Sequence, residues 1–301
     1  MDEVVGVARR VPGWEHVGAQ ALTPLSGGMT NRNYVVDAPD GTACVLRVAG
    51  KDTQLLGIDR VVEAAAQRQA AALGIAPEVL HVVMPEGFLV TRFEPGSEVA
   101  DITEPVTMAR LTAALRSFHG SAPLSGRFDC FEVADTYATA SIARGVQLPP
   151  QFPHAAAVAA DIQTVFKAWQ EPEVPCHHDL LNANLLRADD GRLLILDWEY
   201  AGMGSRWFDL GNMATNHELD AAAREQLIAG YFGSVTVGRL ARLELMQVMS
   251  DLREAMWGVM QQAISRIEFD FVDYASRHFD RMLANASTPT FRQALGHATT
   301  P

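Results

Sequence analysis

The stretch Cys176–Leu186, CHHDLLNANLL, places two histidines, one aspartate and two asparagines between apolar residues. A buried strand does not normally carry so many polar groups, because each needs a hydrogen-bond partner away from water. A surface loop does not normally carry so many leucines. The stretch therefore predicts a polar loop held against the core by its leucines. A metal site, an acid–base site and an ordinary loop remain open as its function.

The segment after this loop, NLLRADDGRLLILDWEY, predicts a β-hairpin. Asp190-Gly191 is a favoured two-residue turn, since both residue types tolerate positive φ. With that turn, Asn184 lies directly opposite Asp197 at the open end of the hairpin. Asp179 stands in the loop that leads into the first strand. The three side chains are thus expected to converge and to offer the oxygen ligands that Mg²⁺ prefers.

The spacing of His177, Asp179 and Asn184 is H-x-D-x₄-N, the catalytic-loop arrangement of protein-kinase-like phosphotransferases. In that arrangement the aspartate accepts the proton of the acceptor hydroxyl, while the asparagine and a later aspartate hold Mg²⁺. Asp197-Trp198-Glu199 stands where protein kinases carry Asp-Phe-Gly. Together these patterns predict phosphoryl transfer.

Other chemistries fit the loop less well. Neighbouring residues such as Cys176 and His177 cannot easily all bind one zinc ion, and the sequence offers no second half with metal-ligand spacing. The G-x-S-x-G elbow of serine hydrolases is missing from the sequence. An ordinary polar loop before a hairpin stays open. His177 is predicted to organise the loop by hydrogen bonds rather than to donate a proton.

The composition is that of a folded protein with an acidic surface. The 301 residues are 48% hydrophobic and 20% charged, with a formal net charge of −12. That charge disfavours nucleic acid and anionic membranes as partners, since both attract basic patches. Three scattered cysteines and a start without a signal-peptide pattern favour the cytoplasm. The oligomeric state is left open.

The chain divides into two parts of different pattern. Residues 1–95 hold strand-like runs around Pro39-Asp40-Gly41 and Pro85-Glu86-Gly87 and one helical stretch that ends at Gly74. Residues 96–301 are mostly helical, with segments predicted at Val106–His119, Ala155–Trp169, Ala221–Phe232, Arg239–Arg266 and Phe271–Ala284. The predicted fold is α+β and bilobal, with a small antiparallel sheet plus a helix and a larger helical lobe.

Several motifs in order resemble those of the choline/ethanolamine kinase family, within the kinase-like group that includes aminoglycoside phosphotransferases. The matching stretches, which together span about Leu25 to Leu283, are LSGGMTNRNY, CVLRVAG, CHHDLLNANLL, LILDWEYAG, RWFDLGN and WGVMQQAISRIEFDFVDYASRHFD. The resemblance implies a protein-kinase-like fold. It also implies an ATP- and Mg²⁺-dependent kinase that phosphorylates the hydroxyl of choline, ethanolamine or a related amino alcohol.

The resemblance also implies roles for single residues. Asp179 would be the catalytic base, Asn184 and Asp197 the Mg²⁺ ligands with help from Glu199, and Asp209 a brace below the catalytic loop. The nucleotide would be bound by Ser26, Gly27, Gly28, Thr30, Asn31, Arg47 and Glu63, where Arg47 pairs with Glu63. Glycines in such a turn allow backbone N–H groups to approach phosphate.

The acceptor pocket is expected near the end of the chain. Choline carries a quaternary ammonium that cannot donate a hydrogen bond, so its recognition depends on aromatic faces and acidic groups. The resemblance places Trp257, Met260, Phe269 and Tyr274 in this pocket. Met260 stands where choline enzymes of the family tend to repeat a tryptophan, which leaves ethanolamine or another amino alcohol open. An aminoglycoside or sugar phosphotransferase and a catalytically inactive nucleotide-binding relative are the alternatives.

Overall fold

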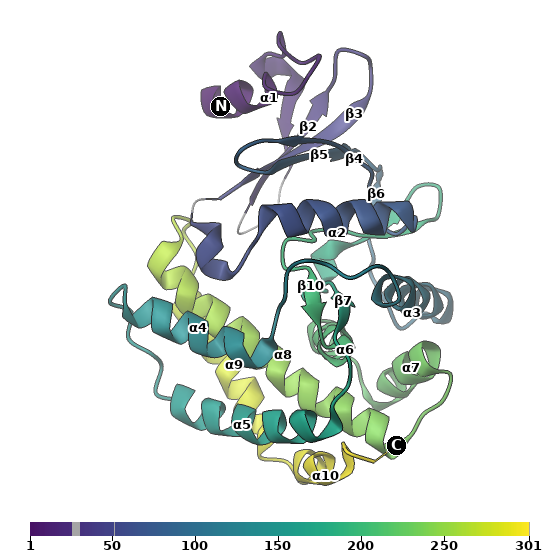
Figure 1. Cartoon of the computed structure of the whole chain (residues 1–301), viewed down its shortest axis with the longest axis vertical. Helices are drawn as coiled ribbons and strands as arrows, with labels where there is room; N and C mark the ends of the chain where they lie inside the picture. Colours follow the sequence, from purple (N-terminus) through teal and green to yellow (C-terminus); the bar gives the residue numbers. More distant parts are fainter. Residues whose placement is uncertain (26–30, 51, 301) are drawn as a thin grey trace.

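The computed structural model describes residues 1–25, 31–50 and 52–300. Its N-terminal part is a five-stranded antiparallel sheet in the order β1-β2-β3-β5-β4, shown at the top of Figure 1. The elements of this part are α1 (Asp2–Ala8), β1 (Leu22–Pro24), β2 (Asn31–Asp37), β3 (Ala43–Ala49), α2 (Arg60–Ala72), β4 (Val79–Val83) and β5 (Phe88–Arg92). Both predicted hairpins of this part are confirmed.

Helix α2 follows the sequence signals at both of its ends. The Asp59 carboxylate accepts hydrogen bonds from the N–H groups of Val61 and Val62, which caps the first turn. Gly74 has a φ of 74°, and the N–H of Ile75 returns to the carbonyl of Ala70. A left-handed residue at this place ends a helix at little cost when it is glycine.

The rest of the chain is mainly helical and lies below the sheet in Figure 1. Its helices are α3 (Pro105–His119), α4 (Cys130–Ile142), α5 (Phe152–Trp169), α6 (Arg206–Asn216), α7 (Ala221–Phe232), α8 (Val237–Ile264), α9 (Phe271–Ala286) and α10 (Pro289–His297). Short strands form two further sheets, β6-β8-β9 and β10-β7. These strands are β6 (Gly96–Glu98), β7 (Val174–Cys176), β8 (Leu185–Ala188), β9 (Leu193–Ile195) and β10 (Gly202–Gly204). The α+β class and the helical C-terminal part are confirmed.

Helices α1, α4, α6 and α10 were not expected from the sequence. The segment of α6, RWFDLGNMATN, contains glycine, asparagine, threonine and aspartate, all of which lower helix propensity. Nearly all of its residues are buried, from Trp207 to Thr215. Packing against α8 therefore stabilises a helix that local preference disfavours.

Two hydrophobic clusters fill the molecule. The smaller cluster joins α1 to the N-terminal sheet, and the larger one fills the helical part. Val62, Ala66 and Ala70 of α2 belong to the larger cluster, so α2 packs against the helical part although it precedes residue 96. The division into residues 1–95 and 96–301 stays a prediction.

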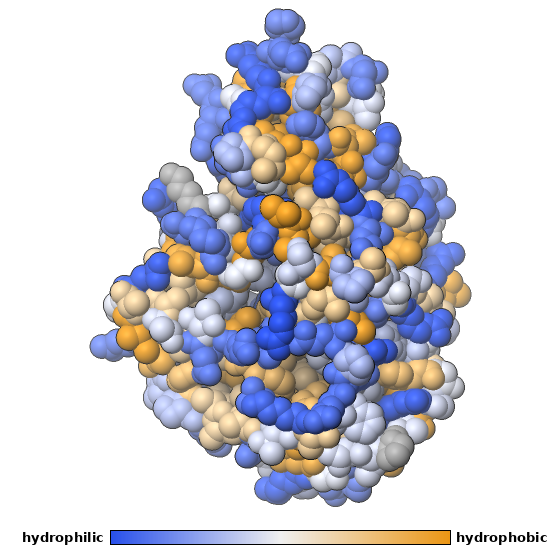
Figure 2. All heavy atoms as spheres, in the orientation of Figure 1, coloured by the Kyte–Doolittle hydropathy of each residue, from blue (hydrophilic) through white to orange (hydrophobic). Residues whose placement is uncertain are grey.

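Exposed apolar side chains are scattered over the surface. Figure 2 shows hydrophilic residues over most of one face, with hydrophobic ones near the level of β4, β5 and α2. Val61 of α2 and Leu80 of β4 are among the exposed apolar residues. Among the described residues, none of the helices has the length and apolar character needed to cross a membrane.

The hairpin of β8 and β9 has a different register from the predicted one. Its pairs are Leu185 with Ile195 and Arg187 with Leu193, so the loop contains three residues rather than two. Gly191 takes a φ of 85°, and the Asp190 carboxylate accepts the N–H of Arg192 at 3.0 Å. These interactions favour a three-residue loop with glycine in the left-handed position.

The register places Asn184 opposite Leu196, not opposite Asp197 as predicted. The N–H of Leu196 donates to the Asn184 carbonyl at 2.8 Å. A shift of one residue turns a strand side chain to the other face of the sheet. Asp197, however, has a φ of 62° and lies beyond the end of β9. This left-handed turn redirects its carboxylate, which contacts Arg47.

Gly211 of α6 packs too closely on α8 for any side chain. A Cβ at Gly211 would lie 2.6 Å from the carbonyl carbon of Met246. We therefore expect Gly211→Ala to lower the free energy of unfolding by about 1–3 kcal/mol, because the two helices must separate. Urea denaturation measures this change.

The matched control is Gly6→Ala in α1, where an added Cβ meets no atom within 4 Å. This change should leave stability equal or raise it by up to about 1 kcal/mol, as expected for alanine in a helix. Equal unfolding midpoints for Gly211→Ala and the unchanged protein would contradict the packing argument.

Candidate active site

The loop that follows β7 is held by the carboxylate of Asp209 in α6. Its Oδ2 accepts the N–H of His177 at 2.8 Å, and its Oδ1 accepts the N–H of His178 at 2.7 Å. One turn further along α6, Asn212 Oδ1 accepts the N–H of Leu180 at 2.6 Å. Three backbone N–H groups of the loop, those of His177, His178 and Leu180, are thus bound by side chains of one helix.

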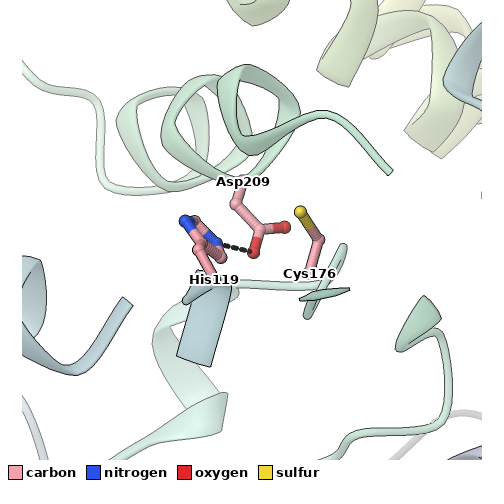
Figure 3. A group of neighbouring side chains, drawn as sticks. All are labelled: His119, Cys176 and Asp209. Carbon is pink, nitrogen blue, oxygen red and sulfur yellow. Dashed lines mark hydrogen bonds and ion pairs between the residues drawn. The ribbon is translucent and has the colours of Figure 1, made fainter. Parts of the chain in front are cut away.

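Asp209 also contacts His119 of α3, and Cys176 lies beside them (Figure 3). His119 Nε2 is 3.0 Å from Asp209 Oδ2, and its Nδ1 is 2.6 Å from the hydroxyl of Tyr231. Burial raises the pKa of Asp209, but the hydrogen bond with His119 and the nearby imidazoles of His178 and His177 outweigh it and lower the pKa to about 2.

These three side chains come close enough to hold a metal ion, but their chemistry favours a structural role. Both carboxylate oxygens of Asp209 already accept hydrogen bonds. Burial raises the pKa of the Cys176 thiol well above its usual value, and thiols bind metals as thiolates. We therefore assign the group to bracing of the loop.

His177 forms the hydrogen bonds predicted for a residue that organises the loop. Its Nδ1 accepts the N–H of Asp179 at 3.1 Å, and its Nε2 is 2.9 Å from the carbonyl of Leu196. Its ring meets the indole of Trp198 edge to face, with centroids 4.6 Å apart. Burial lowers the pKa of His177, so the imidazole is neutral and joins the loop to the strand that leads to Asp197.

Asp179 is buried, and its side chain has two partners. Asn184 Nδ2 donates to the backbone carbonyl of Asp179 at 2.8 Å and to its carboxylate at 3.3 Å. Arg253 Nη1 donates to Oδ1 at 2.9 Å. Burial raises the pKa of Asp179 to about 7 against the effect of Arg253, and the charges of nearby carboxylates add to this rise.

Arg253 was not identified in the sequence. It stands in α8, four positions before Trp257 and therefore on the same helix face. The sequence signal that could have identified Arg253 is a charged residue on the same face of a long helix as the apolar residues. Its side chain is 2% exposed, and its contact with Asp179 joins residues 74 positions apart.

A buried ionic cluster joins the N-terminal sheet and α2 to the segment that follows β9. Arg47 of β3 contacts Glu63 of α2 at 2.9 Å and Glu199 at 3.2 Å, and it also contacts Asp197. The structure thus contains the predicted Arg47–Glu63 pair. Arg60 of α2, which the sequence reading missed, contacts Glu63 at 2.6 Å and Glu199 at 3.1 Å.

Glu199 is surrounded by donors. Its Oε2 accepts from Asn31 Nδ2 at 2.9 Å as well as from Arg47 and Arg60. Its predicted part in metal binding therefore depends on Oε1. Asn31 opens β2 and is tied to Glu199, while the predicted phosphate-contacting residues Ser26, Gly27, Gly28 and Thr30 lie outside the described residues.

Asn184 and Asp197 offer oxygen atoms of the kind that could hold a magnesium ion. Because Asn184 donates through Nδ2 to Asp179, its Oδ1 is the atom left for a cation. The Asp197 side chain is 29% exposed, so its carboxylate remains accessible in the cleft. Mg²⁺ is commonly held by one or two such protein oxygens together with substrate phosphates and water.

An aromatic group is connected to Asp179 through Glu254 and Arg253. Trp257 meets Tyr274 edge to face at 5.6 Å, and Phe269 meets Tyr274 at 5.9 Å. Trp257 Nε1 donates to the hydroxyl of Tyr200 at 3.1 Å, and the Tyr274 hydroxyl donates to Glu254 at 2.7 Å. The structure thus brings together three of the four residues predicted for the acceptor pocket.

Met260 is not part of this group. It is fully buried, and its sulfur accepts a hydrogen bond from the Ser141 hydroxyl of α4 at 3.5 Å. In this structure Met260 packs between α8 and α4, and its contact with the acceptor stays a prediction.

The comparisons with known proteins agree with this geometry. Residues 21–245 match the model of the phosphotransferase enzyme family. A choline/ethanolamine kinase family protein from Mesorhizobium loti is 32% identical in its crystal structure, with a TM-score of 0.82 over 100% of this chain and 99% of that one. The chain belongs to the choline/ethanolamine kinase family. It is a phosphotransferase that acts on an alcohol group, and the resemblance read from the motifs is confirmed.

More distant relatives cover most of the chain as well. Human choline/ethanolamine kinase is 25% identical over 326 aligned residues, which cover 88% of this chain and 80% of the human protein. The crystal structure of LicA in complex with AMP is 20% identical, with a TM-score of 0.71 over 89% of this chain and 93% of that one. At this identity, the likeness to LicA shows only that the two proteins share a fold.

We expect Asp209→Asn to destabilise the kinase by about 2 kcal/mol at pH 7, because an amide cannot accept three N–H donors as a carboxylate does. The pKa of Asp209 is lowered by folding, so its charge stabilises the native state above the unfolded pKa. That contribution is lost as the pH falls toward about 2. Urea denaturation between pH 7 and pH 3 should show that the difference in the free energy of unfolding between Asp209→Asn and the unchanged protein becomes smaller below about pH 4.

The control is Asp135→Asn on the exposed side of α4, which should change stability by less than about 0.5 kcal/mol at every pH. The role of the charge would be contradicted if the free energies of unfolding of Asp209→Asn and the unchanged protein differed little at pH 7, or if their difference did not vary with pH.

Proposed function

We propose that this family member is an ATP- and Mg²⁺-dependent kinase that phosphorylates the hydroxyl of a small amino alcohol. The observation that supports the proposal is the contact of Asn184 with Asp179, together with the Asp197 carboxylate, which lies close enough for its charge to raise the pKa of Asp179. Arg47 contacts Asp197, Arg60 contacts Glu199, and Arg253 links Asp179 to Glu254, which accepts a hydrogen bond from Tyr274. The names of the relatives, choline/ethanolamine kinase and choline/ethanolamine kinase family protein, refer to the same kind of reaction.

Each residue of the cleft has a defined part in this reaction. Asp179 would accept the proton of the acceptor hydroxyl, and its burial keeps the carboxylate basic enough to do so near neutral pH. Asn184 and Asp197 would hold Mg²⁺, which when bound offsets the negative charge of the transferring phosphoryl group. Arg47, which has a permanent charge, would contact the nucleotide phosphates.

Positioning does most of the work in phosphoryl transfer. The Asp209 brace fixes the loop that carries Asp179, and the cluster of Arg47 and Glu63 fixes the sheet above it. Trp257 and Tyr274 would bound the acceptor, with Glu254 as the acidic group near its amine.

We expect Asp179→Asn to reduce kcat by at least about 100-fold, because an amide cannot accept the hydroxyl proton. Asp197→Asn should reduce turnover similarly and should raise the Mg²⁺ concentration needed for half-maximal activity. A coupled assay of ADP release with choline, ethanolamine and related amino alcohols measures both effects. Removal of Mg²⁺ with EDTA should stop turnover of the unchanged enzyme.

Asp161→Asn on the exposed face of α5 is the matched control and should keep full activity. Undiminished turnover by Asp179→Asn would overturn the assignment of the base. Phosphorylation of kanamycin or a sugar, without phosphorylation of any amino alcohol, would favour the alternative acceptors. Binding of ATP without turnover of any acceptor would indicate an inactive relative.

A further inference from the structure

Arg253 places a permanent positive charge beside the proposed catalytic base. Its Nη1 lies 2.9 Å from Asp179 Oδ1 and 2.5 Å from Glu254 Oε1, and the side chain is 2% exposed. The two carboxylates nearest the acceptor are therefore already paired with a cation of the protein itself.

The guanidinium of Arg253 also lies over the aromatic ring of Tyr200. Its central carbon lies 4.4 Å from the ring centroid of Tyr200, whose hydroxyl accepts the indole N–H of Trp257. A cation over an aromatic ring is the arrangement by which aromatic pockets hold substrate ammonium groups. In this chain, Arg253 takes that position over Tyr200.

Two hydrogen-bond donor atoms of Arg253 lack an acceptor among the described residues. Among the described residues, its Nε and Nη2 are buried and have no hydrogen-bond partner. A buried charged donor without an acceptor is costly, and a ligand oxygen that reached it would recover that cost. A carboxylate suits a guanidinium because its two oxygens match two N–H groups of the planar fork.

The aromatic group connects Arg253 with solvent. Phe269 is 42% exposed and contacts Tyr274, whose hydroxyl donates to Glu254 at 2.7 Å. Glu254 in turn contacts Arg253. An acceptor that entered past Phe269 would meet a carboxylate and then a guanidinium before it reached Asp179.

Building on the proposed function, we propose that Arg253 selects amino alcohols that also carry a carboxylate. The acceptor carboxylate binds Nε and Nη2 of Arg253, its ammonium lies toward Glu254, and its hydroxyl faces Asp179. A purely cationic acceptor such as choline has no anionic group that could accept from the unpaired Nε and Nη2 of Arg253. Arg253 is thus the residue that determines the class of acceptor.

Matched pairs of acceptors test this selection. L-Serine differs from ethanolamine, and L-homoserine from 3-aminopropan-1-ol, only by a carboxylate. With Mg²⁺ and ATP saturating, we expect kcat/KM for at least one carboxylate-bearing member to exceed that of its partner by about tenfold or more. Choline serves as the quaternary ammonium probe and should be the poorer acceptor.

Variants of Arg253 test whether this residue causes the preference. Arg253→Met, of similar length but uncharged, should reduce the ratio within the preferred pair by at least about tenfold, mainly through KM of the carboxylate-bearing acceptor. Arg253→Lys keeps the charge without the planar fork and should restore part of the ratio. Thermal unfolding and ATP binding show whether each variant is folded. If Arg253→Met does not fold, the ratio of the two kcat/KM values in the unchanged enzyme still tests the preference for a carboxylate.

The outcomes separate this inference from the proposed function. Better turnover of ethanolamine, 3-aminopropan-1-ol or choline than of both carboxylate-bearing acceptors overturns the selection by Arg253 and leaves the amino alcohol kinase standing. An unchanged ratio in folded Arg253→Met also overturns it. No turnover of any of the five acceptors overturns the proposed function and the inference together.

Discussion

The buried ionic cluster between the two parts of the chain is the interaction on which the cleft depends. Arg47 of β3 and Arg60 of α2 share the carboxylates of Glu63 and Glu199, and Arg47 also contacts Asp197. Charges removed from water are tolerated only when they are paired, so loss of one partner would leave the others uncompensated. The sheet, α2 and the segment after β9 are therefore held in one relative position.

The second constraint acts from below, through α6. Asp209 and Asn212 bind the backbone of the loop that carries Asp179, and Gly211 between them allows α6 to lie against α8. The same helix thus fixes the loop and contacts the helix that carries Arg253 and Trp257. The loop that carries Asp179 and the helix that carries Arg253 and Trp257 are therefore positioned by contacts with the same helix, α6.

Much of the fold and part of the site could be predicted from the sequence. The hairpins of the N-terminal sheet, the ends of α2 and the long helix α8 depend on turn residues and on local periodicity, which a sequence displays directly. The hairpin register after Asn184 could not be obtained in this way. It depends on the choice between a two-residue and a three-residue loop, and the side chain of Asp190 decides that choice.

The sequence by itself determined the family and its alcohol phosphotransfer chemistry, because closely spaced residues such as His177, Asp179 and Asn184 carry that pattern. Only the tertiary structure decided the surroundings of the acceptor. It placed Arg253 against Asp179, 74 positions earlier, and turned Met260 into the core. Contacts between distant segments depend on how helices pack and rotate, and neither spacing nor composition specifies that packing.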